Sequence, residues 1–193
     1  MGRKADARRQ SIVDMATSIL IKGGPGSLVL RDVAERLGIT HGNLQYYFPT
    51  KDALLVGIFD RELEKYTESM KQAVAATSTR QGRLAAIIDA GMKELKSPDT
   101  ALWRMLMSMA DHSADMAAIL KKENDRYQAE LVKELKHIAP DLTLRRRRHI
   151  ARIIHAILDG LGIQFIYADP DSPDTRALVS EIQAAIITLV EAD

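Results

Sequence analysis

The chain has 193 residues, of which 46% are hydrophobic and 27% are charged, a composition typical of a folded globular protein and not of a disordered one. It contains no cysteine, which excludes disulfides and thiolate chemistry. The basic N-terminus is followed by no apolar segment, and the chain lacks the run of about 18 apolar residues that spans a bilayer, so we expect a cytoplasmic protein.

Charge is unevenly distributed along the chain. Residues 1–51 contain eight Lys or Arg and four Asp or Glu, a net charge of +4. The remaining residues contain 19 basic and 22 acidic groups, a net charge of −3. A basic N-terminal part on a mildly acidic remainder favours contact with a polyanion.

Three helices are predicted in the first quarter of the chain. The first spans about Asp6 to Lys22, and Gly23–Gly26, which includes Pro25, ends it. A short helix follows over Leu30–Leu37, and Gly38 makes a tight turn into another short helix over Thr40–Tyr47.

Helices also account for the rest of the sequence. Thr50 can cap a long helix, and Ser172, which precedes Pro173, can cap the last one. Breaks at Ser97–Asp99, His112–Ser113, Pro140–Asp141 and Pro170–Pro173 separate the later segments. These segments are predicted over 80–96, 100–111, 114–139, 143–168 and 173–191. We expect an all-α protein of about nine helices, in which residues 1–51 form one compact domain and residues 52–193 form a larger helical domain.

Residues 29–48, VLRDVAERLGITHGNLQYYF, have the pattern of a helix-turn-helix motif. The two short helices are predicted to pack together through small and apolar residues at their inner positions. These residues are Val33, Ala34, Leu37, Ile39, Leu44 and Phe48. In such a motif the N-terminal part of the second helix enters the major groove of DNA.

Polar residues occupy the positions that face away from this core. Asn43 and Gln45 can bond adenine bidentately, and Thr40 can meet a thymine methyl group or a phosphate. Tyrosine hydroxyls and a lysine at a helix start suit phosphate oxygens. The predicted DNA-binding residues are Thr40, His41, Gly42, Asn43, Gln45, Tyr46, Tyr47 and Lys51, among which Tyr47 and His41 can instead serve packing.

From about Arg9 to Leu55 the sequence resembles the N-terminal domain of the TetR family of bacterial repressors. The resemblance rests on Val33-Ala34, on Gly38 to Leu44, on Tyr46-Tyr47-Phe48 and on Lys51 to Leu55. Ala156 to Leu161 also resembles a stretch of that family's C-terminal dimerisation helix. The resemblance implies a homodimeric regulator that binds a pseudo-palindromic operator and responds to a small molecule, usually as a repressor.

The sequence departs from the family pattern at two positions. Val29 stands where the family has a capping Thr or Ser, so Ser27 is expected to cap the second helix or the helix to fray. Gln45 replaces a tyrosine of many members, which removes one phosphate contact and adds a possible base contact.

Candidate effector residues cluster around the segment ALWRMLMSMADH. Soft methionine side chains adapt to varied apolar guests, although they also serve as ordinary core filling. We expect a small, mainly apolar effector in contact with Trp103, Met107, His112, Tyr127 and His155.

The last two helices carry broad apolar stripes that favour dimerisation. The predicted contacts are Ile157, Leu161, Phe165, Ile182 and Ile186, although these stripes can equally form the core of one chain. The run Arg145–Arg148 opens a helix, where cations oppose the helix dipole, and is interpreted as a solvated face or an acidic-partner contact in preference to a second DNA site.

No paired carboxylates, nucleophile–base set, phosphate loop or metal motif is present in the sequence, so we expect no enzyme activity, no cofactor and no metal. A helical enzyme with an incidental helix-turn-helix and a DNA-binding structural protein without a ligand are the alternatives. The sequence thus predicts a ligand-responsive regulator that binds duplex DNA and does not bind membranes. Its helix-turn-helix DNA-binding domain is expected at 1–51 and its ligand-sensing and dimerisation domain at 52–193.

Overall fold

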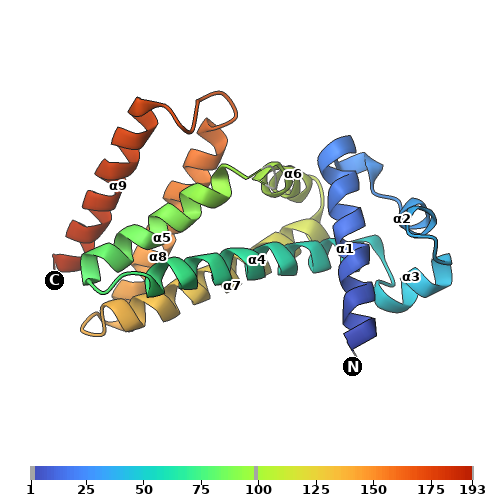
Figure 1. The fold of residues 1–193 in the computed structure, drawn as a ribbon, viewed down its shortest axis with the longest axis horizontal. Helices are drawn as coiled ribbons and strands as arrows, with labels where there is room; N and C mark the ends of the chain where they lie inside the picture. Colours follow the sequence, from blue (N-terminus) through green and yellow to red (C-terminus); the bar gives the residue numbers. More distant parts are fainter. Residues whose placement is uncertain (1–2, 98–99, 193) are drawn as a thin grey trace. The chain divides into compact units, whose positions relative to one another are not determined.

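In the computed structural model, the described residues 3–97 and 100–192 form nine α-helices, one short 3-10 helix and no strand (Figure 1). The elements are α1 (Arg3–Gly23), the 3-10 helix η1 (Pro25–Ser27), α2 (Leu30–Arg36), α3 (His41–Tyr47), α4 (Lys51–Ala75), α5 (Arg80–Leu95), α6 (Thr100–Ala110), α7 (Ala114–Ile138), α8 (Leu144–Gln164) and α9 (Pro173–Glu191). The predicted all-α class is confirmed. No helix within the described ranges combines the length and apolarity that a bilayer crossing requires.

The helices form two compact units. The first contains residues 1–63 and 101–123, and the second contains residues 64–100 and 124–193. This division follows packing, whereas the predicted domains at 1–51 and 52–193 divide the chain by function. The functional division stays a prediction.

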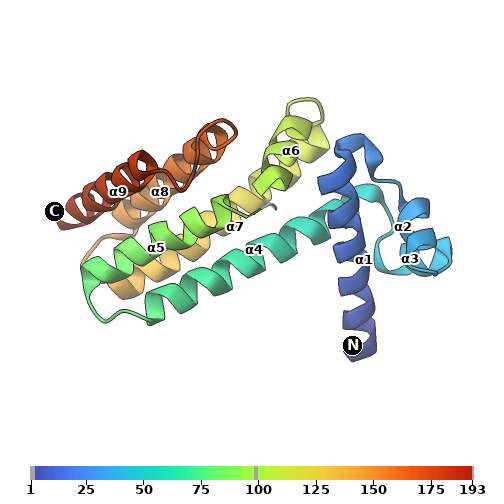
Figure 2. The ribbon, with the colours of Figure 1, turned by 45° about the horizontal axis from the view of Figure 1, so that its top comes forward.

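The first unit is built around apolar side chains of α1. Ile12, Ala16 and Leu20 recur at four-residue intervals and are fully buried. Leu44 and Phe48 bring α3 into the same core, and α2 contacts both α1 and α3. These three helices lie together in both ribbon views (Figures 1 and 2).

The turn between α2 and α3 is a left-handed helix end. Gly38 has a φ of +64°, a backbone conformation that raises the free energy of glycine little and that of residues with a Cβ atom more. Its N–H donates to the carbonyl of Glu35, and the N–H of Ile39 donates to that of Ala34, at 3.0 Å each. This pair of bonds satisfies the last carbonyls of α2 and sends the chain into α3. The predicted turn at Gly38 is confirmed.

Capping follows the sequence at two helix starts and departs from it at a third. The Thr50 hydroxyl accepts from Ala53 N at 3.0 Å, and the Ser172 hydroxyl accepts from Thr175 N at 3.1 Å, as expected of N-caps. Ser27 does not cap α2, because its hydroxyl donates to the carbonyls of Ile19 and Gly24 instead. The helix starts after Val29 without a side-chain cap.

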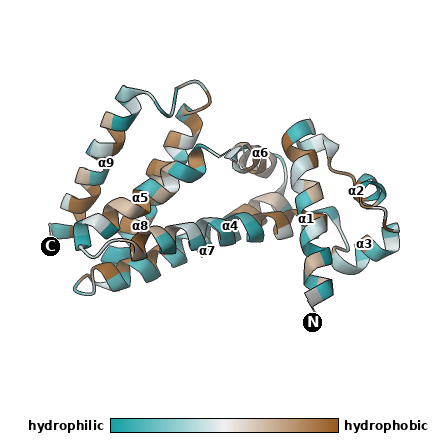
Figure 3. Cartoon of the chain, viewed as in Figure 1, coloured by the Kyte–Doolittle hydropathy of each residue, from teal (hydrophilic) through white to brown (hydrophobic). Residues whose placement is uncertain are grey.

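The second unit packs α5 against α8 and α9, which also contact each other. Apolar residues recur along α8 and α9 (Figure 3), and the buried ones include Ile150, Ile154, Leu158 and Ile186. The long apolar pattern of α8 predicted a helix to residue 168, but α8 ends at Gln164. Beyond this residue the N–H groups of Ile166 and Tyr167 donate to carbonyls three residues back, Ile163 at 3.2 Å and Gln164 at 3.1 Å, so the chain tightens into turns before the apolar pattern ends.

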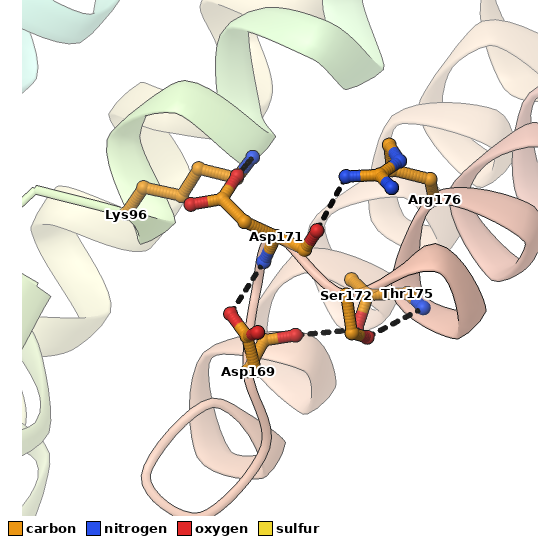
Figure 4. Close-up of polar contacts among 6 residues, drawn as sticks. All are labelled: Lys96, Asp169, Asp171, Ser172, Thr175 and Arg176. Carbon is orange, nitrogen blue, oxygen red and sulfur yellow. Dashed lines mark hydrogen bonds and ion pairs between the residues drawn. The ribbon is translucent and has the colours of Figure 1, made fainter.

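The connection between α8 and α9 is held by polar contacts (Figure 4). Asp171 N–H donates to the Asp169 carboxylate at 2.9 Å, and the Thr175 hydroxyl donates to the Asp169 carbonyl at 2.8 Å. Lys96 pairs with the Asp171 carboxylate at 2.6 Å, and the Arg176 guanidinium donates to the Asp171 carbonyl. The expected break at Ser97–Asp99 includes residues 98 and 99, which lie outside the described residues.

The Phe48 side chain, at the end of α3, packs closely against other helices of the first unit. It is buried, and a Cβ added to Gly57 of α4 would lie 2.6 Å from its Cε1 atom. The guanidinium carbon of Arg9 lies 4.9 Å from the centroid of the ring, in the geometry of a cation–π contact. Phe48 therefore joins α3 to both α1 and α4.

We predict that Gly57→Ala destabilises the protein relative to Gly42→Ala. Both substitutions gain helix propensity, but only Gly57→Ala forces a methyl group against the buried Phe48 ring, whereas a Cβ at Gly42 meets nothing within 4 Å. Overpacking of this kind costs about 1–3 kcal/mol. Urea unfolding of both variants measures the difference, and equal unfolding free energies would contradict the close contact.

Candidate DNA-binding surface and effector residues

The outer side of α3 presents the polar residues that the sequence predicted. His41, Gly42, Asn43, Gln45 and Tyr46 are exposed. On the inner side Leu44 and Phe48 are buried, so the helix separates a polar face from a core face. The structure brings these predicted residues together on one short helix, and their contacts with DNA stay a prediction.

Thr40 has a structural task at the start of α3. Its hydroxyl oxygen accepts from Asn43 N at 3.1 Å, which satisfies one of the free N–H groups of the first turn. The residue is exposed, and its hydroxyl proton is free of this bond. Thr40 can therefore fix the helix start and still donate to an oxygen outside the protein.

The two tyrosines at the end of α3 differ in environment. Tyr46 is 72% exposed, whereas Tyr47 is half-buried and packs against the core of the first unit. Their rings meet edge to face with centroids 5.2 Å apart. The hydroxyl of Tyr46 is thus held at the surface by a partly fixed neighbour.

Lys51 at the start of α4 is oriented by a contact that the sequence did not suggest. Its Nζ atom donates to the carbonyl of Pro25 at 3.3 Å. An ammonium group has three donors, so this bond leaves two for another acceptor.

Gly57 and Arg9, which contact the Phe48 ring, were not predicted from the sequence either. An isolated glycine in the apolar α4 pattern was the one available signal.

The predicted effector residues fall in two different units. Trp103, Met107 and His112 belong to the first unit, whereas Tyr127 and His155 belong to the second. Trp103 packs on Phe59 with ring centroids 5.1 Å apart. Met107 and His112 are exposed. Their predicted role in effector binding stays a prediction.

Tyr127 and His155 do lie together, in a stack that includes Tyr66. The Tyr127 ring is 4.5 Å from that of His155 and 4.9 Å from that of Tyr66, centroid to centroid. The Tyr127 hydroxyl donates to that of Tyr66 at 2.9 Å. Burial raises the pKa of Tyr66 to about 12 and that of Tyr127 well above its usual value, so both phenols stay neutral.

His155 also contacts two polar residues. Its Nδ1 atom lies 3.1 Å from Gln128 Nε2, and its Nε2 atom lies 3.5 Å from the Asp159 carboxylate. Burial lowers the pKa of His155, against the opposing effect of Asp159. Burial raises the pKa of Asp159, against the opposing effect of His155. A neutral imidazole with its proton on Nε2 satisfies both neighbours.

The residues predicted for dimerisation have mixed environments. Leu161 and Ile186 are only 3% and 2% exposed and pack within the core of their own unit, as the alternative interpretation of the stripes allowed. Ile157, Phe165 and Ile182 are half-buried against that core. Ile153 and Ile163 of α8, which are not among the five predicted contacts, are exposed. Solvent-facing apolar area on α8 thus lies beside the predicted positions.

Comparison with known proteins agrees with the fold and the motif. Residues 12–58 match the description "Bacterial regulatory proteins, tetR family", and residues 80–188, more than half of the chain, match "BetI-type transcriptional repressor, C-terminal". The chain therefore belongs to the TetR family of transcriptional regulators. Within that family its C-terminal part is of the BetI type.

Relatives of similar length support this assignment. The regulator BetI of Burkholderia cenocepacia is 25% identical over 191 residues, which cover 97% of this chain and 96% of the relative. BetI of Brucella anthropi is 23% identical over 178 residues, or 91% of this chain and 90% of the relative.

Solved structures show the same fold at lower identity. GusR of Salmonella enterica is 15% identical and superposes with a TM-score of 0.74 over 95% of both chains. A TetR transcription regulator from Haloarcula marismortui is 18% identical, with a TM-score of 0.71 over 97% of this chain and 98% of that one.

We predict that His155 makes unfolding depend on pH between 8 and 6. Because its folded pKa lies below the unfolded value of about 6.5, the unfolded chain binds the proton first as pH falls. The free energy of unfolding should therefore be largest above pH 6.5 and decrease below it. His155→Gln should show a weaker dependence than wild type.

Urea unfolding at several pH values between 8 and 6 measures this dependence. The carboxyl group of Asp159 has a raised pKa in the folded state, so its protonation increases the free energy of unfolding as pH falls and opposes the effect of His155. Measurements above pH 6 keep this opposing effect small. His137→Gln, which removes an exposed histidine of α7, is the matched control. Identical pH dependences for wild type and His155→Gln would refute the prediction.

Proposed function

We propose that this regulator is a ligand-responsive repressor that acts as a homodimer and reads a pseudo-palindromic operator with α3. The observation that carries the proposal is the polar outer face of α3 on a helix whose inner face is immobilised through Phe48. A packed helix that presents amide and hydroxyl groups on its exposed face suits the major groove. In a two-fold dimer, two such helices would meet half-sites about 34–36 Å apart or somewhat further.

The side chains at this surface divide by the chemistry they offer. Asn43 and Gln45 are exposed amides that can each make two hydrogen bonds with adenine. Tyr46 and Lys51 offer a hydroxyl and an ammonium group, which suit phosphate oxygens. We therefore assign base recognition to the amides and positioning on the backbone to Tyr46 and Lys51, with Thr40 and His41 at the helix start.

We expect the two classes of residue to respond differently to substitution. Lys51→Gln and Tyr46→Phe should weaken binding to all DNA sequences alike, and Lys51→Gln should reduce the slope of log affinity against log salt by about 0.9. Asn43→Ala or Gln45→Ala should cost on the order of 1–3 kcal/mol at particular base pairs and relax preference there.

The experiment begins with selection of bound sequences from random duplex DNA by the full-length protein. Anisotropy titrations on the selected site and on its single-base variants, at several salt concentrations, then separate the two classes. Lys93→Gln removes an exposed cation from α5 of the second unit and serves as the control. No sequence preference at any salt, or an unchanged preference in both amide variants, would exclude the proposal.

Dimerisation is assigned to the exposed side of α8 together with the half-buried positions predicted from the sequence. Ile163 is 49% exposed, and Ile153 lies on the same helix with its side chain also exposed. Apolar area of this kind is stabilised when a second copy covers it. Ile157, Phe165 and Ile182 are half-buried and pack against the core of the second unit.

We predict that Ile163→Glu converts a dimer into a folded monomer, because a carboxylate at a covered apolar interface would lose its hydration without a partner. Light scattering measures the mass, and circular dichroism measures helix content. Val29→Glu places the same charge on an exposed apolar residue of the first unit and should leave the dimer intact. A monomeric wild type, or an Ile163→Glu variant that stays dimeric, would count against this interface.

The proposal includes a small, mainly apolar effector. Support comes from the ring stack of Tyr66, Tyr127 and His155, which places aromatic faces beside polar atoms within the second unit. Such combinations of aromatic walls and few polar groups are typical of small-molecule sites. An effector that prefers a different arrangement of the dimer would release DNA, and DNA would weaken effector binding by the same factor.

A further inference from the structure

The arginine run that opens α8 has no task in the proposed function. Four basic residues fall at the spacing i, i+3, i+4 and i+7 of one helix face, namely Arg145, Arg148, His149 and Arg152. All four are exposed. Arg146, in the same run, points elsewhere, since its guanidinium donates to the Leu189 carbonyl of α9 at 2.8 Å. Within the run, Arg145 and Arg148 therefore lie on the exposed cationic face, whereas Arg146 contacts α9 and Arg147 is half-buried.

This cationic face forms one wall of a groove of about 820 Å³ within the second unit. The opposite wall belongs to α7, where Asp125 and Ala129 line the groove. Small-molecule sites have volumes of about 300–1,000 Å³. A groove of this size, bounded by two helices, suits a small molecule better than the flat face of an acidic protein.

The charges that line the groove are unbalanced. Three arginines face one carboxylate, that of Asp125, and His149 lines the groove beside them. Among the residues that the structure describes, none forms an ion pair or side-chain hydrogen bond with Arg145, Arg148 or Arg152. Like charges at this helical spacing repel each other, and cations in the first turn oppose the helix dipole. An anion in the groove would relieve both effects.

We propose that the groove between α7 and α8 binds a small molecule that carries several anionic groups, such as a polyphosphate or a polycarboxylate. Guanidinium groups bind phosphate and carboxylate oxygens through paired N–H donors. Seven residues of helix advance about 10 Å, so the three guanidinium groups offer donors along an extended stretch of the groove. A ligand with at least two anionic groups that are separated along its length matches this row of donors best.

Isothermal titration calorimetry of the full-length protein with tripolyphosphate and with citrate, at constant ionic strength, tests this site. The two ligands distinguish a phosphate source from a carboxylate source of the same chemistry. Ala129→Glu adds a carboxylate to the groove wall and should weaken binding at least about tenfold, because like charges at short range repel strongly. Ala129→Gln, of similar shape and without charge, should retain affinity within about twofold.

A second pair of variants decides the outcome if Ala129→Glu does not fold. Arg148→Gln combined with Arg152→Gln removes two exposed cations of the groove and should abolish measurable binding. Lys22→Gln combined with Lys93→Gln removes two exposed cations outside it and should leave binding unchanged. Absence of binding by both ligands, or equal loss in the arginine and lysine pairs, would overturn the proposal. The readout involves no DNA, so it is independent of operator binding.

Discussion

The contact of Phe48 with Gly57 and Arg9 is the constraint on which the candidate DNA-binding surface depends. Phe48 directly follows α3, and its ring lies against α4 and under the guanidinium of α1. A helix of seven residues has too few internal hydrogen bonds to be stable alone. Tertiary packing through Leu44 and Phe48 therefore holds α3, and the positions of its exposed side chains follow from that packing.

Polar contacts around this core refine the same arrangement. Arg61 of α4 pairs with Asp14 of α1 at 2.6 Å, which joins the two helices that enclose Phe48. Lys51 reaches back to the Pro25 carbonyl between α1 and α2. Each bond is at or near the surface and contributes modestly to stability. Their effect is to orient the start of α4, and with it the ammonium group assigned to a phosphate.

Much of the fold and of α3 could be predicted from local sequence. Helical periodicity, Gly38 and the caps at Thr50 and Ser172 depend on neighbours within a few residues, and the structure confirms them. The pairing of Lys51 with Pro25, the Arg9 contact and the division of effector residues between two units depend on residues far apart in sequence. Ser27 shows the same limit, because its hydroxyl finds carbonyls at the end of α1 before it can cap α2.

Helix α8 shows why an apolar stripe alone does not identify an interface. Ile150, Ile154 and Leu158 face the core, so the regular spacing that suggested dimerisation also serves the monomer. The exposed Ile153 and Ile163 are set apart from that stripe by rotation about the helix axis. Ile163 follows Arg145 by 18 residues, or about five full turns, so it shares the angular position of the arginines and is separated from them along the helix axis. One helix thus combines core packing on one side with a cationic groove near its start, beside α7, and an exposed isoleucine near its end, because both its circumference and its length separate these surfaces.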